Sequence, residues 1–464
     1  MKRIAWVLTA VFGCAGAAQA AEYTGVAASG AWYHIQAPDG WQAGGPLVLY
    51  QHGLDFKTPA DPPGLGPLRS LMLSEGYAVA ATTYRQRGWA LFTAVEDNRE
   101  LLDIVAEKIG APGEVVPFGG SLGGLVALKV AEADGFPPIK GTYALCPAAA
   151  GARIWDAAID LRLAYDVVCH DAGDLPTGRQ PLPWAFDLDD IPNDLSDLGD
   201  QAAVLGTLVE INQCTGVNLP PLLRNDAMQR RLDELMAFAH LTDEDFFVTN
   251  MAYATYAMSD LVRAPDKLDG HNPFTTAGVD YGSDADIQAG IARIVAEPSA
   301  AAEFAAVSNF HGDVGDAKVL SMHTSRDELV VPSNQEFVRN VLPADQVTSA
   351  IVDEDSPTHC GFTDAEGVAG WEALRAWKDG APQPDVTALQ SECEAVVATG
   401  DVDGPCRFDA NVQLVPFDSL VRPRSTTTTT PTRPGHSTHA LPPILRDAPI
   451  PPPRGVPARS QAID

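Results

Sequence analysis

The sequence has few basic residues and no hydrophobic run long enough to span a membrane. Lys and Arg number 31 against 61 Asp and Glu, so the 464 residues carry a net charge of -30. A field of that sign repels nucleic-acid phosphates and anionic bilayers, and we expect neither as a partner. The most apolar stretch, residues 4–13, is about half of the ~20 residues that a span needs, which predicts no transmembrane segment.

Residues 1–20 have the pattern of a secretory signal peptide. A basic pair is followed by the apolar stretch and then by an Ala-x-Ala cleavage site that ends at Ala20. We expect cleavage after Ala20 and a secreted or periplasmic protein. Cys14 leaves open the alternative of a lipid-modified signal.

Beyond this signal the chain contains an even number of cysteines, namely Cys146, Cys169, Cys214, Cys360, Cys393 and Cys406. An even number in an exported chain favours disulfide bonds. The six allow many pairings, and only the local pair of Cys393 with Cys406 is favoured by its spacing.

The sequence also lacks the spacing of known metal sites. It contains no paired Cys and His residues at zinc spacing and no D-x-D-x-D-G calcium loop. We expect no metal ion and no other cofactor. A calcium site nevertheless stays open where acidic residues cluster, at Asp187, Asp189, Asp190, Asp194, Asp197 and Asp200.

The last segment, residues 421–464, differs from the rest in composition. It holds six Arg, two Asp and ten Pro, and Thr fills positions 426–430. Such a segment cannot bury enough apolar surface to offset the entropy of ordering it. We expect a disordered Thr/Pro-rich tail, preceded by a C-terminal extension over residues 381–420.

Up to residue 150, short apolar runs alternate with helical patterns. Runs typical of buried strands occupy residues 46–51, 77–83, 114–118 and 140–145, and helical spacing marks residues 92–109 and 122–133. The pattern resumes after Asp316, with strands at 318–323 and 349–353 and a closing helix at 365–377. Strands that alternate with helices in this way form β-α-β units. The sequence therefore predicts an α/β fold with a mostly parallel sheet flanked by helices.

Residues 151–315 interrupt this alternation. They show no strand runs but carry helical patterns, as at 226–240 and 287–296. Ligands of such sheets bind at the carboxyl ends of the strands, where an insertion after the strand at 140–145 leaves the sheet. We expect a large helical cap there, which divides the core into residues 21–150 and 316–380.

One motif indicates a catalytic nucleophile. Residues 119–123 read Gly-Gly-Ser-Leu-Gly, a G-x-S-x-G pattern between a predicted strand and a predicted helix. A nucleophile on a sharp turn needs neighbours without bulk two positions before and two positions after it, and Gly119 and Gly123 meet that need. Gly120 completes the predicted nucleophile elbow. Ser121 is the candidate nucleophile. The alternative, a Gly-rich nucleotide loop, lacks the Walker lysine and the dinucleotide spacing. Pro117 would remove a donor from a central strand, so we expect it at the strand's C-terminal end.

On this motif the sequence resembles the α/β-hydrolase superfamily, in particular secreted bacterial serine esterases with a helical cap, over about residues 40–380. The resemblance implies the chain order Ser, acid, His. Residues 319–332 look like the family's acid loop and make Asp327 the acid, with Glu328 and Asp353 as rivals. Residues 356–362 look like the loop that carries the base and make it His359.

The resemblance also implies an oxyanion hole. The backbone N–H of Leu122 directly follows the nucleophile, and the turn of His52, Gly53 and Leu54 resembles the family's oxyanion loop, which offers the N–H of Leu54. His52 itself is interpreted as an architectural residue rather than as a second base.

These residues predict a secreted serine hydrolase that cleaves carboxylic esters through an acyl-enzyme on Ser121. The same triad would serve a peptidase or amidase of the prolyl-peptidase type, because the fold does not fix the leaving group. The Thr-rich run resembles linkers of polyester depolymerases, which adds that alternative, and a noncatalytic binding protein is a further one. The acidic surface favours a neutral, small-molecule ester substrate. The oligomeric state stays open.

Overall fold

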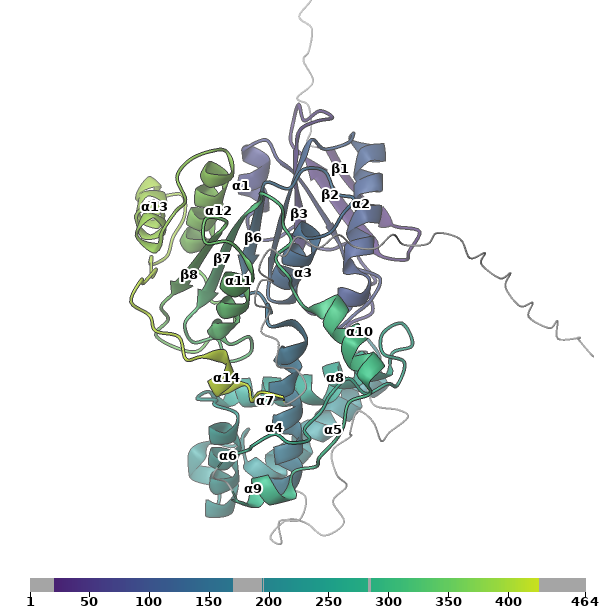
Figure 1. Cartoon of the computed structure of the whole chain (residues 1–464), viewed down its shortest axis with the longest axis vertical. Helices are drawn as coiled ribbons and strands as arrows, with labels where there is room; N and C mark the ends of the chain where they lie inside the picture. Colours follow the sequence, from purple (N-terminus) through teal and green to yellow (C-terminus); the bar gives the residue numbers. More distant parts are fainter. Residues whose placement is uncertain (1–20, 170–193, 195, 283–284, 425–464) are drawn as a thin grey trace, which may run out of the picture. The chain divides into compact units, whose positions relative to one another are not determined.

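The computed structural model describes residues 21–169, 194, 196–282 and 285–424 (Figure 1). Several sequence predictions fall outside these ranges. They are the signal peptide, Cys14, the acidic residues Asp187, Asp189 and Asp190, and the tail from residue 425 onward.

An eight-stranded sheet forms the centre of the fold. Its strands are β1 (Ala21–Val26), β2 (Trp32–Ala37), β3 (Pro46–Gln51), β4 (Ala78–Thr82), β5 (Glu114–Gly120), β6 (Gly141–Leu145), β7 (Lys318–Thr324) and β8 (Val347–Val352). The order is β1-β2-β4-β3-β5-β6-β7-β8. The strands from β4 to β8 pair in parallel, whereas β2 is antiparallel to both of its neighbours. The predicted fold class is confirmed.

Pro117 lies in the middle of β5, opposite Leu49, so the prediction that it ends the strand is wrong. The central strand tolerates it because continuous pairing with β6 starts only at Phe118. Before that point, β5 meets the chain ahead of β6 only at a single bridge, between Val115 and Ile139.

Helices cover both faces of the sheet (Figure 1). Helices α2 (Ala94–Lys108) and α3 (Leu122–Ala131) pack with strand residues such as Leu47 and Leu49. Helices α1 (Arg69–Ser74), α12 (Asp364–Lys378) and α13 (Val386–Thr399) pack with residues such as Val48. Neighbouring residues of a strand point to opposite faces, and both faces here are apolar, which is why these strands read as continuous apolar runs.

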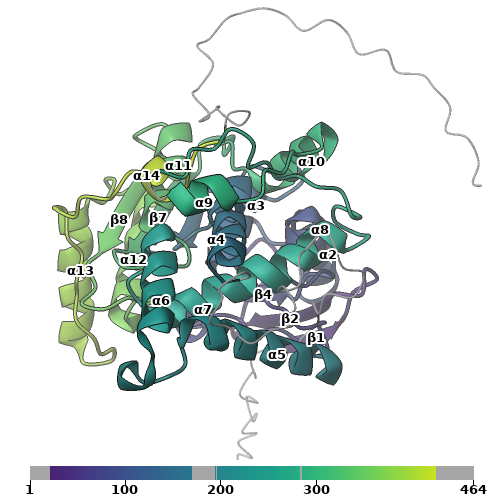
Figure 2. The same ribbon diagram turned by 90° about the horizontal axis from the view of Figure 1, so that it is seen from below.

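The chain between β6 and β7 forms a helical insertion, seen from below in Figure 2. It contains α4 (Ile154–Cys169), α5 (Leu198–Thr215), α6 (Asp226–Phe238), α7 (Glu244–Ala252), α8 (Met258–Arg263), α9 (Ala285–Gly290) and α10 (Pro298–Ser308). No strand occurs among the described residues of this insertion. The helix predicted at 287–296 is wrong beyond Gly290, where the chain runs without regular structure to Glu297.

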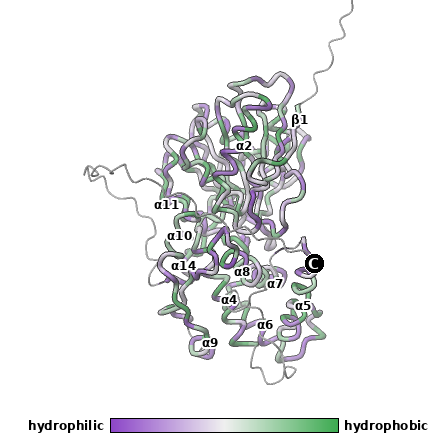
Figure 3. Tube along the Cα trace, turned by 90° about the vertical axis from the view of Figure 1, so that its right-hand side faces the viewer, coloured by the Kyte–Doolittle hydropathy of each residue, from purple (hydrophilic) through white to green (hydrophobic). Residues whose placement is uncertain are grey.

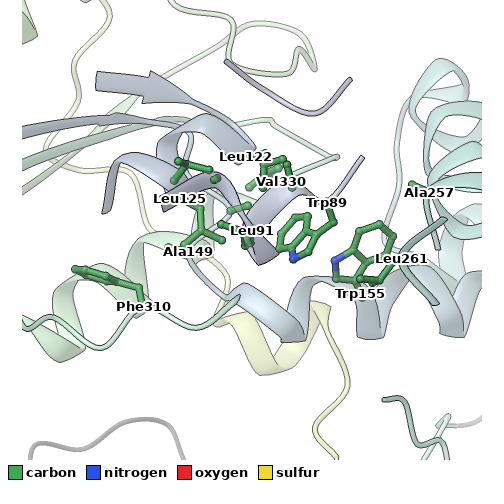
Figure 4. Packing of buried hydrophobic residues seen from close by; sticks show 14 of the residues in the cluster. Trp89, Leu91, Leu122, Leu125, Ala149, Trp155, Ala257, Leu261, Phe310 and Val330 are labelled. Atoms are coloured by element: carbon green, nitrogen blue, oxygen red, sulfur yellow. The ribbon is translucent and has the colours of Figure 1, made fainter. Parts of the chain in front are cut away.

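Two tryptophans join the insertion to the core. Trp89, from the loop after β4, packs edge to face against Trp155 of α4, with ring centroids 5.4 Å apart (Figure 4). The indole N–H of Trp89 donates to Ser308 Oγ of α10 at 2.9 Å. Aromatic pairs of this kind are worth about 1 kcal/mol beyond their buried area, so the contact stabilises the packing of the insertion against the core.

The C-terminal segment returns to the fold. After helix α14 (Phe417–Leu420), Val421 is 3% exposed and Arg424 2% exposed, so the tail does not begin at residue 421 as predicted. We call residues 412–424 the C-terminal strap, because they run from the β8 side of the core to helix α4 of the insertion.

Three disulfides link Cys146 to Cys360, Cys169 to Cys214 and Cys393 to Cys406. The predicted local pair is present. No helix in the described ranges is long and apolar enough to cross a bilayer. Hydrophobic and hydrophilic segments alternate along the trace (Figure 3).

Candidate active site

Ser121 lies on a sharp turn between the end of β5 and the start of α3. Its backbone is strained, with φ 59° and ψ -128°, a region that residues with a side chain rarely occupy. A Cβ on Gly119 would lie 2.6 Å from the carbonyl oxygen of Gln51, and one on Gly123 would lie 2.6 Å from that of His52. The turn therefore requires the two glycines that the motif supplies.

The structure brings Ser121, His359 and Asp327 together. His359 Nε2 lies 2.9 Å from Ser121 Oγ, and His359 Nδ1 lies 2.7 Å from Asp327 Oδ2. An Nδ1–H that donates to the carboxylate leaves Nε2 free to accept the serine proton. The three side chains follow β5, β8 and β7, so parallel strands deliver them to one edge of the sheet.

Asp327 is fixed and ionised. Its Oδ1 accepts the backbone N–H groups of Leu329 and Val330, each at 3.0 Å. Burial alone would raise the pKa of Asp327, but the imidazoles of His323 and His359 outweigh it and hold that pKa well below the usual range. Asp327 is therefore a carboxylate at neutral pH.

The two rivals for the acid have other partners. Glu328 accepts hydrogen bonds from the hydroxyl and backbone N–H of Thr242 in the insertion. Asp353 accepts from the hydroxyl of Ser325 at 2.8 Å. Neither carboxylate takes the place beside His359 that Asp327 occupies.

Sequence reasoning missed His323. This residue of β7 is fully buried, its Nε2 donates to the carbonyl of Val330 at 2.6 Å, and the same nitrogen lies 3.6 Å from Asp327 Oδ2. The other ring nitrogen of His323, Nδ1, lies 3.4 Å from the side-chain amide nitrogen of Gln335. His323 comes under the acid only because the loop after β7 folds back over the strand, and no spacing in the sequence signals that fold.

The turn expected to form the oxyanion hole lies against the nucleophile. A Cβ on Gly53 would lie 3.7 Å from Ser121 Cβ, and Leu54, Ser121 and Leu122 line one cavity. His52 stacks on Tyr84 with ring centroids 4.4 Å apart, and its Nδ1 lies 2.7 Å from the carbonyl of Gly53. Burial lowers the pKa of His52, as befits a neutral architectural residue.

A cavity of about 370 Å³ opens at Ser121. Core, insertion and strap all contribute apolar walls, including Trp89, Trp155, Leu161, Phe238, Tyr253, Leu329, Val412, Leu414, Leu420 and Val421. Its size falls within the range of small-molecule sites. Sequence reasoning missed the strap's part, because nothing in residues 412–424 indicates which element they pack against.

The described residues hold one cluster of potential metal ligands, formed by Cys146, Asp327, His359 and Cys360. The two sulfurs form a disulfide, and the Asp327 carboxylate is hydrogen-bonded to the His359 imidazole. These atoms already have their partners, so the cluster belongs to the site above and is not a separate ion site.

The fold is identified by its strand order and by the antiparallel β2. It is identified further by the positions of three residues, with Ser121 on the turn after β5, Asp327 after β7 and His359 after β8. The chain has the α/β-hydrolase fold. No family model and no curated protein matches the sequence.

Similarity to solved structures is low. A lipase in its open form is 15% identical, with a TM-score of 0.37 over 82% of this chain and 100% of that one. A 2,6-dihydroxy-pseudo-oxynicotine hydrolase is 12% identical, with a TM-score of 0.32 over 84% and 71%. A rice cell wall degrading esterase from Xanthomonas oryzae is 11% identical, with a TM-score of 0.32 over 82% and 88%. The α/β-hydrolase assignment rests on this chain's own strand order and site geometry.

Proposed function

We propose that this protein is a serine hydrolase that cleaves carboxylic esters through an acyl-enzyme on Ser121. The hydrogen-bonded series from Ser121 through His359 to Asp327, set on the strained turn, carries the proposal. A serine hydroxyl is a weak nucleophile near neutral pH. His359 takes its proton and later returns it to the leaving alcohol, while Asp327 fixes the tautomer and stabilises the imidazolium.

The backbone N–H groups of Leu122 and Leu54 stabilise the charge that develops on the ester's carbonyl oxygen. Leu122 is the first residue of α3, where N–H groups have no partner within the helix. Leu54 follows Gly53, whose Cα lies beside Ser121. One such donor is typically worth about 3 kcal/mol in the transition state.

The cavity favours an ester with an apolar acyl or aryl group and no negative charge. Its walls are mostly apolar, and the chain as a whole is strongly acidic. Two arginines line the cavity, and both have other partners. Arg326 donates to the backbone carbonyl of Asp355. Arg422 donates to the backbone carbonyl of Phe238, and its guanidinium carbon lies 3.9 Å from the centre of the Phe238 ring. Both cations are engaged, so neither is held ready for a substrate carboxylate.

The three disulfides support an exported protein, since such bonds persist in oxidising compartments. We place the mature chain outside the cytoplasm, with cleavage after Ala20. A peptidase or amidase of the prolyl-peptidase type is the second candidate, because the same three side chains serve both reactions.

A panel of neutral p-nitrophenyl esters, set beside aminoacyl and prolyl anilides, tests the proposal. We expect ester turnover well above anilide turnover, and stoichiometric reaction of Ser121 with a fluorophosphonate. Anilide turnover that matches ester turnover would favour the peptidase. A protein that neither turns over esters nor reacts with the fluorophosphonate would be a binding protein.

A further inference from the structure

The residue after the candidate base is held by a disulfide. Cys360 follows His359 directly and is bonded to Cys146, the residue after β6. Cys146 is fully buried, and its backbone N–H donates to the carbonyl of Met322 at 2.7 Å. One residue earlier, the carbonyl of Leu145 accepts the backbone N–H of Ser121 at 3.0 Å. The bond thus ties the histidine's loop to the strand end that supports the nucleophile.

The loop itself has little regular structure to hold it. Residues 353–363, between β8 and α12, form no helix or strand. Both cysteines have a positive φ, 39° at Cys146 and 54° at Cys360, and residues other than glycine rarely adopt such a backbone conformation. Cys360 Sγ lies 3.7 Å from Nε2 and 3.8 Å from Nδ1 of His359, so the sulfur packs against the imidazole.

We propose that the disulfide of Cys146 and Cys360 is a positioning element that keeps His359 between Ser121 and Asp327. The inference rests on the proposed function, since it assigns a means of holding the same site. Hydrogen bonds place the two ends of the imidazole, but the backbone that carries it lies in an irregular loop. A displacement of about 1 Å at a reacting group can cost about 100-fold in rate, so a covalent tether one residue away is a direct means of control.

The chain supplies its own controls. Cys169 and Cys214 join α4 to α5 within the insertion, and Cys393 and Cys406 join α13 to the segment after it. None of these four lines the cavity at Ser121. The Cys169–Cys214 bond is the matched control, because it joins two helices of the insertion and its removal separates positioning from a general loss of stability. The Cys393–Cys406 bond is not matched in this way, because Arg407, the residue after Cys406, donates to the carbonyl of Gly361 in the histidine's loop.

The test replaces each disulfide by a pair of alanines and compares the three variants at a temperature at which each is folded by circular dichroism. For Cys146→Ala with Cys360→Ala we expect kcat for a neutral ester to fall about 100-fold. KM should change less than about threefold, because the cavity walls remain. The control variant without the Cys169–Cys214 bond should keep kcat within about twofold of the wild type.

Proton NMR gives a second readout that does not need activity. The Nδ1 proton shared by His359 and Asp327 should give a low-field resonance in the wild type and in the Cys169–Cys214 control. This resonance should be lost or broadened without the Cys146–Cys360 bond. An unchanged resonance together with an unchanged kcat would overturn the inference. Absence of ester turnover in the wild type, with the resonance behaving as described, would instead count against the proposed function alone.

Reduction provides the same test if the double alanine variant does not fold. In a variant with alanine at Cys169, Cys214, Cys393 and Cys406, the remaining disulfide is reduced by a dithiol. The dithiol gives two electrons and two protons to form two thiols and becomes a cyclic disulfide itself. Loss of kcat and of the low-field resonance while the fold persists supports the inference, and retention of both contradicts it.

Discussion

Arg424 and Asp160 form a buried ion pair across 264 residues of sequence. Arg424 Nη2 lies 2.8 Å from Asp160 Oδ1, and each side chain is 1% exposed. The same guanidinium donates to the backbone carbonyl of Asp156, one turn earlier on α4. The end of the strap is therefore fastened to the insertion, above the cavity that both of them line.

Replacement of Arg424 by alanine should lower the free energy of unfolding by about 3–5 kcal/mol, because it leaves the Asp160 carboxylate buried without its cation. Urea denaturation measures the change. Lys108→Ala is the matched control, since Lys108 pairs with Glu107 at the surface and such pairs contribute at most about 1 kcal/mol. Equal small losses in both variants would show that Arg424 is not a structural anchor.

Two truncations separate the strap from the tail. A chain that ends at Arg424 should keep full ester turnover, because the composition after it cannot form a core. A chain that ends at Asp409 should lose both stability and turnover, since it lacks the buried Phe417, Val421 and Arg424. Activity that survives the second truncation, or fails in the first, would contradict this division.

Leu414 should limit the length of the acyl group. Its side chain lies in the strap's wall of the cavity, so Leu414→Trp would fill space that a long acyl chain needs. We expect kcat/KM for an eight-carbon ester to fall at least about tenfold, while that for an acetyl ester changes little. Ser419→Trp, at an exposed position of α14 outside the cavity lining, is the control. A uniform loss for all chain lengths would show that Leu414 does not select.

Glu75 should make stability fall as pH rises. Burial and the neighbouring Glu372 raise the pKa of Glu75 to about 7, although Trp371 donates to it at 2.7 Å. A carboxyl with a raised folded-state pKa stabilises the fold at low pH, and this contribution is lost as pH rises from about 4.5 through about 7. The decrease in Tm between about pH 5 and about pH 8 should be smaller in Glu75→Gln than in the wild type. The same decrease in both proteins would be the contrary result.

Much of the core could be predicted from sequence because its strands are buried on both faces. Pro46–Gln51 is apolar up to its last residue, and β3 has these same bounds. The elbow could be predicted because the backbone needs glycine at 119 and 123 for steric reasons that are local. The candidate acid and base followed from resemblance and chain order, and the structure places His359 between Ser121 and Asp327.

The features that escaped prediction depend on long-range contacts. β1 lies at the edge of the sheet with alternate residues exposed, so it lacks a long apolar run. The pairing of Cys146 with Cys360 spans 214 residues, and spacing carries no information over that distance. Arg424 and His323 have their roles only through partners brought close by the fold.

Hydrolysis of a neutral p-nitrophenyl ester by wild type and Ser121→Ala shows whether Ser121 is the nucleophile. The substitution removes one hydroxyl from the elbow and leaves the core untouched, so the variant should fold as the wild type does. Loss of a triad member commonly costs about a million-fold in turnover, and we expect the variant's rate to fall to background. A correctly folded Ser121→Ala protein that keeps a tenth of wild-type turnover would show that the nucleophile lies elsewhere.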